Sequence, residues 1–107
     1  MKPIVWIGNS LHDLRAFPDT AQRAAGYQLG KVQAGDLPDD WKPISTIGVG
    51  VTELRIRDEA GAFRLIYVAR FANAVYVLHA FKKKSQKTSW QDVDLARKRF
   101  RSIRGDA

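Results

Sequence analysis

The start of the chain predicts one short strand and one short helix. Ile4 to Ile7 are continuously apolar, which is typical of a short buried strand. Asn9 or Ser10 follows and is suited to cap a helix that runs through Phe17, with Asp13 at the matching position of a capping box.

A second helix is expected directly after the first. Pro18 ends the first helix and is also suited to the first position of the next one, which should reach about Ala34 and stop at Gly35. Residues three or four positions apart give it one packing face, formed by Ala21, Ala25, Gln28 or Leu29, and Val32. The two helices then form a helical hairpin.

The segment after this hairpin is rich in turn-forming residues. Pro38, Asp39, Asp40 and Pro43 surround Trp41 and favour an irregular connection. We expect the ring of Trp41 to fill a place in the core rather than to serve as a binding platform, because a large aromatic side chain buries much apolar surface.

From Ile44 onward the pattern is typical of strands. Three segments are rich in β-branched and aromatic residues, namely Val51 to Arg57, Ala62 to Phe71 and Val75 to Phe81. Short turn sequences separate them, at Asp58 to Gly61 and at Ala72 and Asn73. This arrangement predicts an antiparallel meander.

The last segment predicts a basic helix. Thr88 or Ser89 is suited to cap it, and it should end near Arg104. We expect Val93, Ala96, Phe100 and Ile103 on its inner face and Arg97, Arg101 and Arg104 on its outer face. The order of strand, helical hairpin, meander and helix predicts an α+β fold, with the hairpin packed on the sheet.

Length and composition favour one domain over residues 1–107, because 107 residues of which 45% are hydrophobic can build one core. The chain has no cysteine and two histidines that lie far apart, so we expect no metal and no other cofactor. No apolar run approaches the length of a membrane span, and the N-terminus lacks a signal-peptide profile. We therefore expect a cytoplasmic protein that does not bind membranes.

The formal charge of +7 is concentrated near the C-terminus. Residues 79–104 hold nine Lys and Arg against two Asp, whereas the rest of the chain holds nine basic and nine acidic residues. Such a distribution is typical of a surface that binds a polyanion. The alternative is a solvated basic helix that only increases solubility.

Pairing across the two short turns brings basic strand residues together. Arg55 should face Arg64 in the first hairpin, and a closing pair of Phe71 with Ala74 places His79 on the same face of the sheet. A register slip of one residue would break this group. Four more basic residues leave the last strand at the same end of the sheet, namely Lys82, Lys83, Lys84 and Lys87.

This cationic group suits cleavage of an RNA phosphodiester. The ribose 2′-hydroxyl attacks the adjacent phosphate, and guanidinium and ammonium groups stabilise the growing negative charge without a metal. His79 is a candidate for proton transfer, because imidazole is suited to this role near neutral pH. The expected catalytic residues are Arg55, Arg64, His79 and Lys83, and the expected RNA contacts are Lys82, Lys84, Lys87, Arg97 and Arg101.

Several of these residues also have a structural interpretation. A histidine within an apolar strand is more often a core residue with satisfied hydrogen bonds, and Tyr67 is expected in the core on the other face. Facing arginines destabilise a sheet unless an anion or an acid lies between them, and Glu53 is a candidate for that acid. The lysine run is also typical of a solvated strand end.

Six segments together resemble the phage-associated HigB branch of the RelE/ParE toxin superfamily. They are VWIGNSLHDLRAFP, GYQLGKVQAG, DDWKPI, ELRIRD, GAFRLIYVARF and AVYVLHAFKKKSQKT, followed by the basic helix. The resemblance covers nearly the whole chain. It implies a compact RelE-like fold, a cognate helix-turn-helix antitoxin of the HigA type, and cleavage of mRNA on the translating ribosome.

The resemblance also implies site residues. The arginine of FRLIY is Arg64, the arginine of ELR is Arg55, and the basic positions after the last strand are Lys82 to Lys84, which matches the cluster derived from strand pairing. The usual threonine-proline is here Thr88 and Ser89. The terminal tyrosine of the best-known RelE enzymes has no counterpart in this chain. The acid or base is therefore His79, a lysine, or absent.

Two other functions fit the same pattern. One is a ParE-like toxin of the same fold that binds DNA gyrase, and the other is a phage protein that binds nucleic acid without cutting it. Cleavage of transcripts on expression, gyrase-dependent DNA damage, or salt-sensitive binding without cleavage would distinguish the three.

Overall fold

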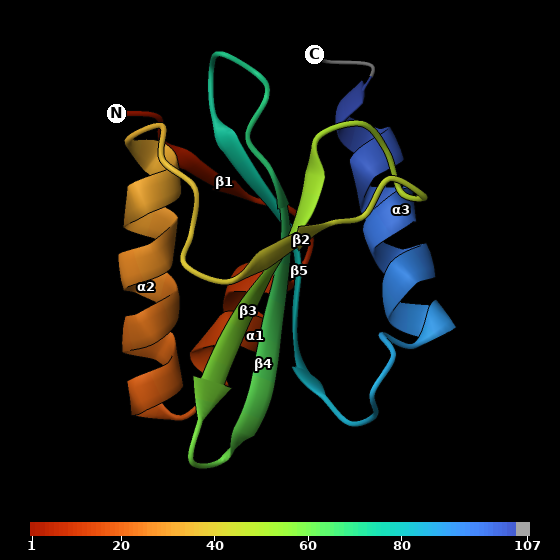
Figure 1. Cartoon of the computed structure of the whole chain (residues 1–107). Coiled ribbons are helices and arrows are strands. Elements are labelled where there is room, and N and C mark those ends of the chain that lie inside the picture. The colour runs from red at the N-terminus through yellow and green to blue at the C-terminus, as the bar shows by residue number, and fades with distance from the viewer. Residues whose placement is uncertain (105–107) are drawn as a thin grey trace.

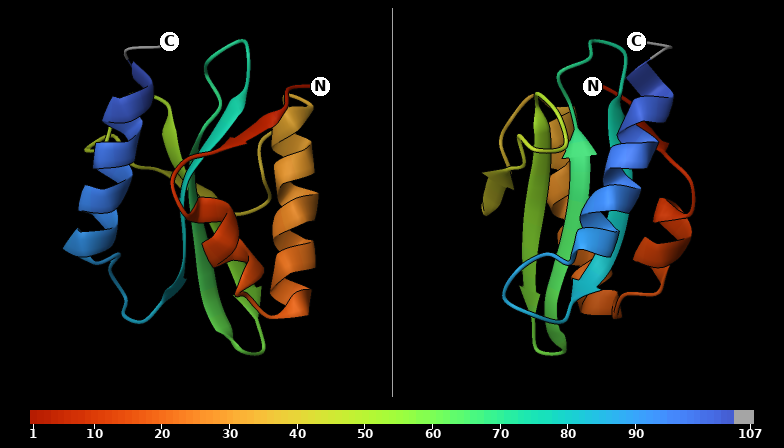
Figure 2. Two further views of the ribbon diagram at one scale, coloured as in Figure 1. Left: turned by 180° about the vertical axis from the view of Figure 1, so that it is seen from behind. Right: turned by 90° about the vertical axis from the view of Figure 1, so that its right-hand side faces the viewer.

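The computed structural model describes residues 1–104, apart from the side chain of Arg104, and contains a five-stranded sheet. Along the chain the elements are β1 (Ile4–Trp6), α1 (Ser10–Arg15), α2 (Asp19–Gln33), β2 (Trp41–Pro43), β3 (Val51–Asp58), β4 (Gly61–Val68), β5 (Val75–Lys83) and α3 (Trp90–Arg104). Figures 1 and 2 show α1 and α2 on one face of the sheet and α3 on the other. The predicted α+β class is confirmed.

The strand order in the sheet is β1-β5-β4-β3-β2. The predicted antiparallel meander is formed by β3, β4 and β5. The edge strand β1 pairs in parallel with β5, and the other edge strand β2 pairs antiparallel with β3. A parallel pair requires a long crossover, and here the crossover contains every element from α1 to β4.

The sequence predicted the end of α2 better than the start of α1. The predicted end of α2 is confirmed, because Gly35 has a φ of +95°, a left-handed value that favours glycine after a helix. Asn9, one of the two predicted caps of α1, occupies the N-cap position, but its side chain forms no capping hydrogen bond, and the buried Ser10 lies inside the helix. The Ser10 hydroxyl instead donates to the carbonyl oxygen of Val77 (3.1 Å), which ties α1 to β5.

The expectation that Trp41 is buried is wrong. Trp41 opens the edge strand β2, in which all three residues are exposed, and 39% of its own surface is accessible. It pairs with Leu54 of β3 through the backbone, so the strand adds to the sheet without covering it. A three-residue edge strand has too few positions for a detectable alternation of apolar and polar residues.

Two hydrophobic clusters lie on opposite faces of the sheet. The first joins α1 and α2 to residues of β3, β4 and β5, including Leu54, Leu65 and Tyr67, so the predicted burial of Tyr67 is confirmed. The second joins α3 to the other face, with Ala96, Phe100 and Ile103 buried as predicted. No helix within residues 1–104 is long and apolar enough to cross a membrane.

The last hairpin keeps the predicted register only near the cationic end. Arg64 pairs with Phe81 and Ile66 with His79, but the register then shifts, so Tyr67 pairs with Val77 and Leu78 has no partner. The expected pair of Phe71 with Ala74 does not form, because β4 ends at Val68. Arg70 leaves the ladder and donates from Nε to the carbonyl of Val49 (3.1 Å).

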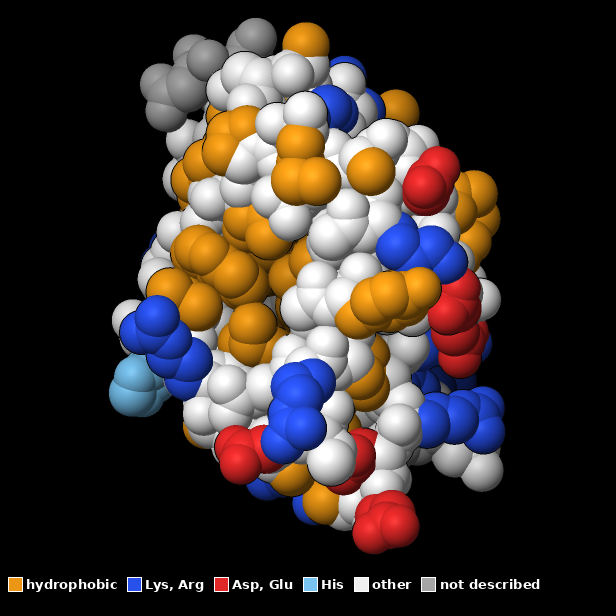
Figure 3. Space-filling model, turned by 90° about the vertical axis from the view of Figure 1, so that its left-hand side faces the viewer, with side chains coloured by type: hydrophobic (Ala, Val, Ile, Leu, Met, Phe, Trp, Pro, Cys, Tyr) orange, Lys and Arg blue, Asp and Glu red, His pale blue; other side chains and the backbone are white. Residues whose placement is uncertain are grey.

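The outer surface on the α2 side carries apolar side chains. Tyr27 on α2 is 68% exposed, and Leu37, in the loop that follows, is 60% exposed. Viewed from this side, charged side chains lie mainly along the lower part and the right edge of the molecule (Figure 3).

Candidate anion-binding site

The two arginines predicted to face each other do so. Arg55 of β3 pairs with Arg64 of β4, and Arg57 pairs with Ala62. These positions lie toward the β3–β4 turn, and Lys83, at the end of β5, pairs with Ala62 on the other side of β4. The sheet therefore holds three cationic side chains from three adjacent strands close together.

A buried carboxylate lies between these cations. Glu53 is 3% exposed, accepts a hydrogen bond from Nε of Arg55 (3.3 Å) and lies 3.5 Å from Nε of Arg64. It also accepts a hydrogen bond from the Thr88 hydroxyl (2.7 Å), which ties the β5–α3 loop to the sheet. Glu53 is thus the acid that neutralises the facing arginines, as the structural interpretation predicted.

Arg64 is mostly buried but lines a hollow next to the Glu53 cavity, together with Lys83 and Lys84. It is 8% exposed, its Nη1 donates to the carbonyl of Phe63 (3.1 Å), and its Nε has no hydrogen-bond partner. Burial lowers the pKa of Arg64, and the carboxylate of Glu53 opposes that effect. Arg64 therefore supplies a largely buried positive charge at the edge of this hollow.

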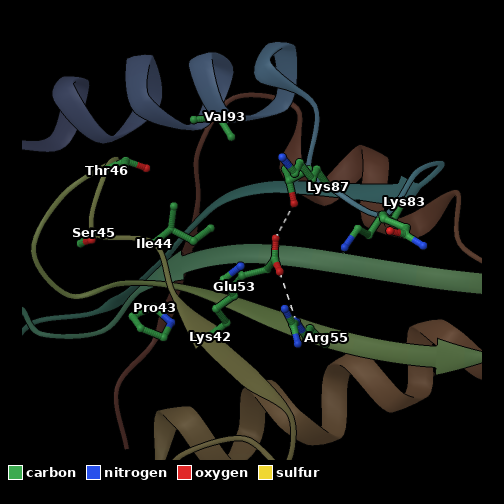
Figure 4. A pocket seen from close by; sticks show the side chains of 12 residues that line it. Lys42, Pro43, Ile44, Ser45, Thr46, Glu53, Arg55, Lys83, Lys87 and Val93 are labelled. Atoms are coloured by element: carbon green, nitrogen blue, oxygen red, sulfur yellow. Dashed lines mark hydrogen bonds and ion pairs between the residues drawn. The ribbon is translucent and has the colours of Figure 1, made fainter.

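A cavity of about 410 Å³ opens over Glu53. We call it the Glu53 cavity; its basic lining residues are Lys42, Arg55, Lys83 and Lys87. Figure 4 shows Glu53 at its centre, with Arg55 on one side and the chain at Lys87 on the other. Among residues 1–104 the three lysines form no ion pair. The acid of this cavity is engaged by the protein, whereas its lysines can bind an external anion.

The surroundings of Lys83 perturb its ammonium group. Partial burial lowers the pKa of Lys83, and the nearby charges of Arg64 and Arg55 lower it further, against the attraction of Glu53. A lysine with a lowered pKa can exchange a proton more readily than an exposed lysine. Lys83 also lines two neighbouring cavities, so it lies at the point where three hollows meet.

His79 lies on the same face as the arginines but is engaged elsewhere. It is 5% exposed, and its Nε2 lies 2.7 Å from Oδ1 of Asp92 on α3. Its ring stacks on Phe81 with centroids 4.8 Å apart, and its Nδ1 is buried without a hydrogen-bond partner. The register places Ile66 between His79 and Glu53. His79 does not line the Glu53 cavity and serves as a packing contact between β5 and α3.

The residues predicted to bind RNA divide between several surfaces. Lys82 turns to the opposite face of the sheet, where its Nζ lies 5.9 Å from the centroid of the Phe63 ring. Lys84 and Lys87 are exposed in the loop after β5. On α3, Arg97 pairs with Asp94 (2.6 Å) and Arg101 is exposed. Lys82, Lys84 and Lys87 all line the hollow next to the Glu53 cavity, and Lys87 lines the Glu53 cavity as well.

Three residues were not predicted from the sequence as part of this site. Glu53 was predicted only as a structural acid, Lys42 lies on the unpredicted strand β2, and Thr88 was expected only as one of two candidates, with Ser89, for the cap of α3. Ser89 is the residue that caps α3, because its hydroxyl oxygen accepts from the Asp92 backbone N–H (3.2 Å). Within residues 1–104 no three His, Asp or Glu side chains gather as metal ligands would.

Fold and cavity together define an α+β protein with a basic site at one end of its sheet. Residues 12–101 match the family of phage-derived Gp49-like proteins (DUF891). The match spans most of the chain, so the protein belongs to the Gp49-like family. This membership supports the resemblance to RelE/HigB-like toxins in general. No curated protein matches the chain.

Proposed function

We propose that the protein is a toxin of the HigB type that cleaves mRNA on the ribosome in the cytoplasm and is neutralised by a helix-turn-helix antitoxin. The observation that carries this proposal is the Glu53 cavity, in which four basic side chains surround one engaged carboxylate. Membership of the Gp49-like family supports a phage-related, toxin-like protein. The RelE-like character of the fold is part of the same proposal.

The residues of the cavity suit a metal-independent transesterification. The 2′-oxygen bonds to the adjacent phosphorus as the bond to the 5′-oxygen breaks, which leaves a 2′,3′-cyclic phosphate and a free 5′-hydroxyl. Arg55, Lys83 and Lys87 stabilise the charge on the non-bridging oxygens. The 2′-hydroxyl proton passes to a base and the 5′-oxygen receives one from an acid. Lys83, with its lowered pKa, is the proposed group for one of these transfers.

The accessible residues test the proposal better than Arg64, because replacement of a buried charged residue also destabilises the fold. Wild type and Lys83→Ala, Lys87→Ala and Lys98→Ala variants are expressed under tight control, and 5′ ends are mapped on a translated and an untranslatable copy of one transcript. Lys98 is an exposed α3 residue outside the cavities described above and is the control. We expect cuts only in the translated copy, lost in the first two variants and kept in the control.

Two other results would favour a different function. Growth arrest with intact transcripts and gyrase-dependent DNA damage would support the ParE-like alternative. Intact transcripts without arrest would contradict any toxin activity.

One observation favours a second candidate, a protein that binds nucleic acid without cutting it. The imidazole of His79 is engaged with Asp92 and does not line the Glu53 cavity. Without proton transfer by Lys83, the same cavity would bind RNA phosphates but not cleave the chain. Salt-sensitive binding of purified protein to RNA that stays uncut on and off the ribosome would support this candidate.

A further inference from the structure

A second cavity lies beside the Glu53 cavity, toward the start of α3. It has a volume of about 380 Å³, and we call it the Asp92 cavity. Residues lining it include Lys82, Lys83, Lys84, Lys87, Thr88, Ser89 and Asp92. Lys83, Lys87 and Thr88 line both cavities, so the two hollows are contiguous along the loop that joins β5 to α3.

The two cavities have the same electrostatic design. Each is lined by four basic side chains and one carboxylate. In the Glu53 cavity the carboxylate accepts from Arg55 and Thr88. In the Asp92 cavity it pairs with His79 (2.7 Å) and accepts from the Ser89 hydroxyl (2.7 Å). Each acid is thus held by protein groups, and the lysines of both cavities remain available to external anions.

The loop between the cavities is held in place. Thr88 is bound to Glu53 on the sheet, Ser89 caps α3, and the Ser85 hydroxyl donates to the carbonyl of Lys87 (2.8 Å). Lysines on a constrained loop lose less conformational freedom on binding than lysines on a flexible one. The two cavities therefore have a fixed spacing, with Lys83 and Lys87 between them.

We infer that the Asp92 cavity is a second phosphate subsite, and that the ligand is a single-stranded polynucleotide whose adjacent phosphates occupy the two cavities. The inference rests on the proposed action on RNA. It adds that the protein binds two phosphates of the ligand at once. A single chain is the favoured ligand, because a covalent link brings the second phosphate to its subsite at high effective concentration, which offsets the repulsion between the two anions. A mononucleotide fills only one subsite.

The test compares short 2′-O-methyl oligonucleotides, which bind but lack the attacking hydroxyl. Dissociation constants are measured by calorimetry for a dinucleotide, a trinucleotide and a tetranucleotide, with one, two and three internucleotide phosphates. We expect binding to tighten about tenfold from the dinucleotide to the trinucleotide, since one further charge-assisted contact forms, and little beyond that. The slope of log affinity against log salt should change from about −0.7 to about −1.4, as expected for one and two phosphates on a single strand.

Variants assign the subsites. Lys84 lines the Asp92 cavity but not the Glu53 cavity, and Lys42 shows the reverse. Lys84→Ala should remove the advantage of the trinucleotide and leave the dinucleotide unchanged, whereas Lys42→Ala should weaken both. Lys98→Ala should change neither. Equal affinity of wild type for dinucleotide and trinucleotide, or no measurable binding of either, would overturn the inference.

Cleavage of translated transcripts is measured on the same preparations. Cleavage without the gain in affinity from dinucleotide to trinucleotide overturns the second subsite but not the proposed nuclease activity. That gain without cleavage or growth arrest overturns the proposed nuclease activity and leaves a binding protein with two phosphate subsites.

Discussion

The two faces of the sheet differ in what they bury. Against α1 and α2 the buried side chains of the sheet are apolar, apart from the hydroxyl of Tyr67. Against α3 the sheet buries a carboxylate, a guanidinium and an imidazole, namely Glu53, Arg64 and His79. These groups lie on three adjacent strands, next to the basic loop that lines both cavities.

This difference indicates that the faces have separate roles. Burial of each apolar side chain stabilises the fold. Burial of a charged group is unfavourable unless interactions with its partners offset the loss of hydration. The α3 face keeps such groups although an apolar substitution of similar volume is often neutral or stabilising. Both faces contribute apolar burial to stability, and we attribute ligand binding to the α3 face alone.

The largest effect is expected on the hairpin face. Leu65 is fully buried against α1 and α2. Leu65→Ala leaves a cavity and should lower the free energy of unfolding by about 3 kcal/mol, measured by urea denaturation. At temperatures where the variant is folded, it should bind the trinucleotide as wild type does. Weakened binding by folded protein would show that the two roles are not separate.

The next largest effect is expected at Glu53. Glu53→Gln keeps the shape and the contact with Thr88 but leaves Arg55 and Arg64 facing each other without an acid, and should cost about 2 kcal/mol. Glu59→Gln in the exposed turn is the control and should change stability by less than about 0.5 kcal/mol. Adding Arg64→Met to Glu53→Gln should restore much of the loss. No recovery would contradict the role given to this pair.

A smaller effect is expected where α3 meets β5. Asp92→Asn removes the charge from the contact with His79 and should lower the free energy of unfolding by about 1.5 kcal/mol. Asp94→Asn, on the exposed side of α3, is the matched control and should cost less than about 0.5 kcal/mol. Equal losses of unfolding free energy in denaturant titrations of the two variants would mean that the contact of Asp92 with His79 stabilises the protein no more than an exposed ion pair does.

The smallest effect has the opposite sign. The pKa of Lys83 is lowered in the folded protein, mainly by burial, so the folded state binds fewer protons than the unfolded state at pH values between the lowered pKa and 10.5. Stability contributed by this group rises with pH across that window. Lys83→Met should raise stability at pH 7 by no more than about 0.5 kcal/mol and abolish cleavage. The gain, measured in urea, should shrink as the pH approaches 10. A loss of stability at pH 7 would contradict the cause given for the pKa shift.

The elements with strong periodic or turn signals were predictable from the sequence. The end of α2 at Gly35, the meander, and the facing of Arg55 and Arg64 across a short turn follow from local residues and simple pairing. The exposed Trp41 was not predictable, because an isolated tryptophan in a turn-rich segment does not reveal a three-residue edge strand. The parallel pairing of β1 with β5 also leaves no local signal.

The site was predictable only in part, for a similar reason. Strand alternation places Glu53, Arg55, Arg64 and His79 on one face, but the engagement of His79 depends on its contact with Asp92 of α3. Lys42 joins the Glu53 cavity through the unpredicted strand β2. Contacts that form only when distant segments pack together are not encoded in the spacing of residues along one segment.

The pairing of β1 with β5 also governs when the protein can fold during its own synthesis. Ser10 donates to the Val77 carbonyl, 67 residues further along the chain, and β1 has its only strand partner in the described residues in β5. Since chains emerge from the ribosome N-terminus first, the amino-terminal strand waits for β5 before it can pair. A nascent chain that stops before β5 lacks the strand that joins β1 to β4 and also lacks Lys83. The protein is proposed to cut mRNA on the ribosome. A cut in its own message ahead of the β5 codons would therefore leave a chain without β5 and Lys83, which we expect to be inactive.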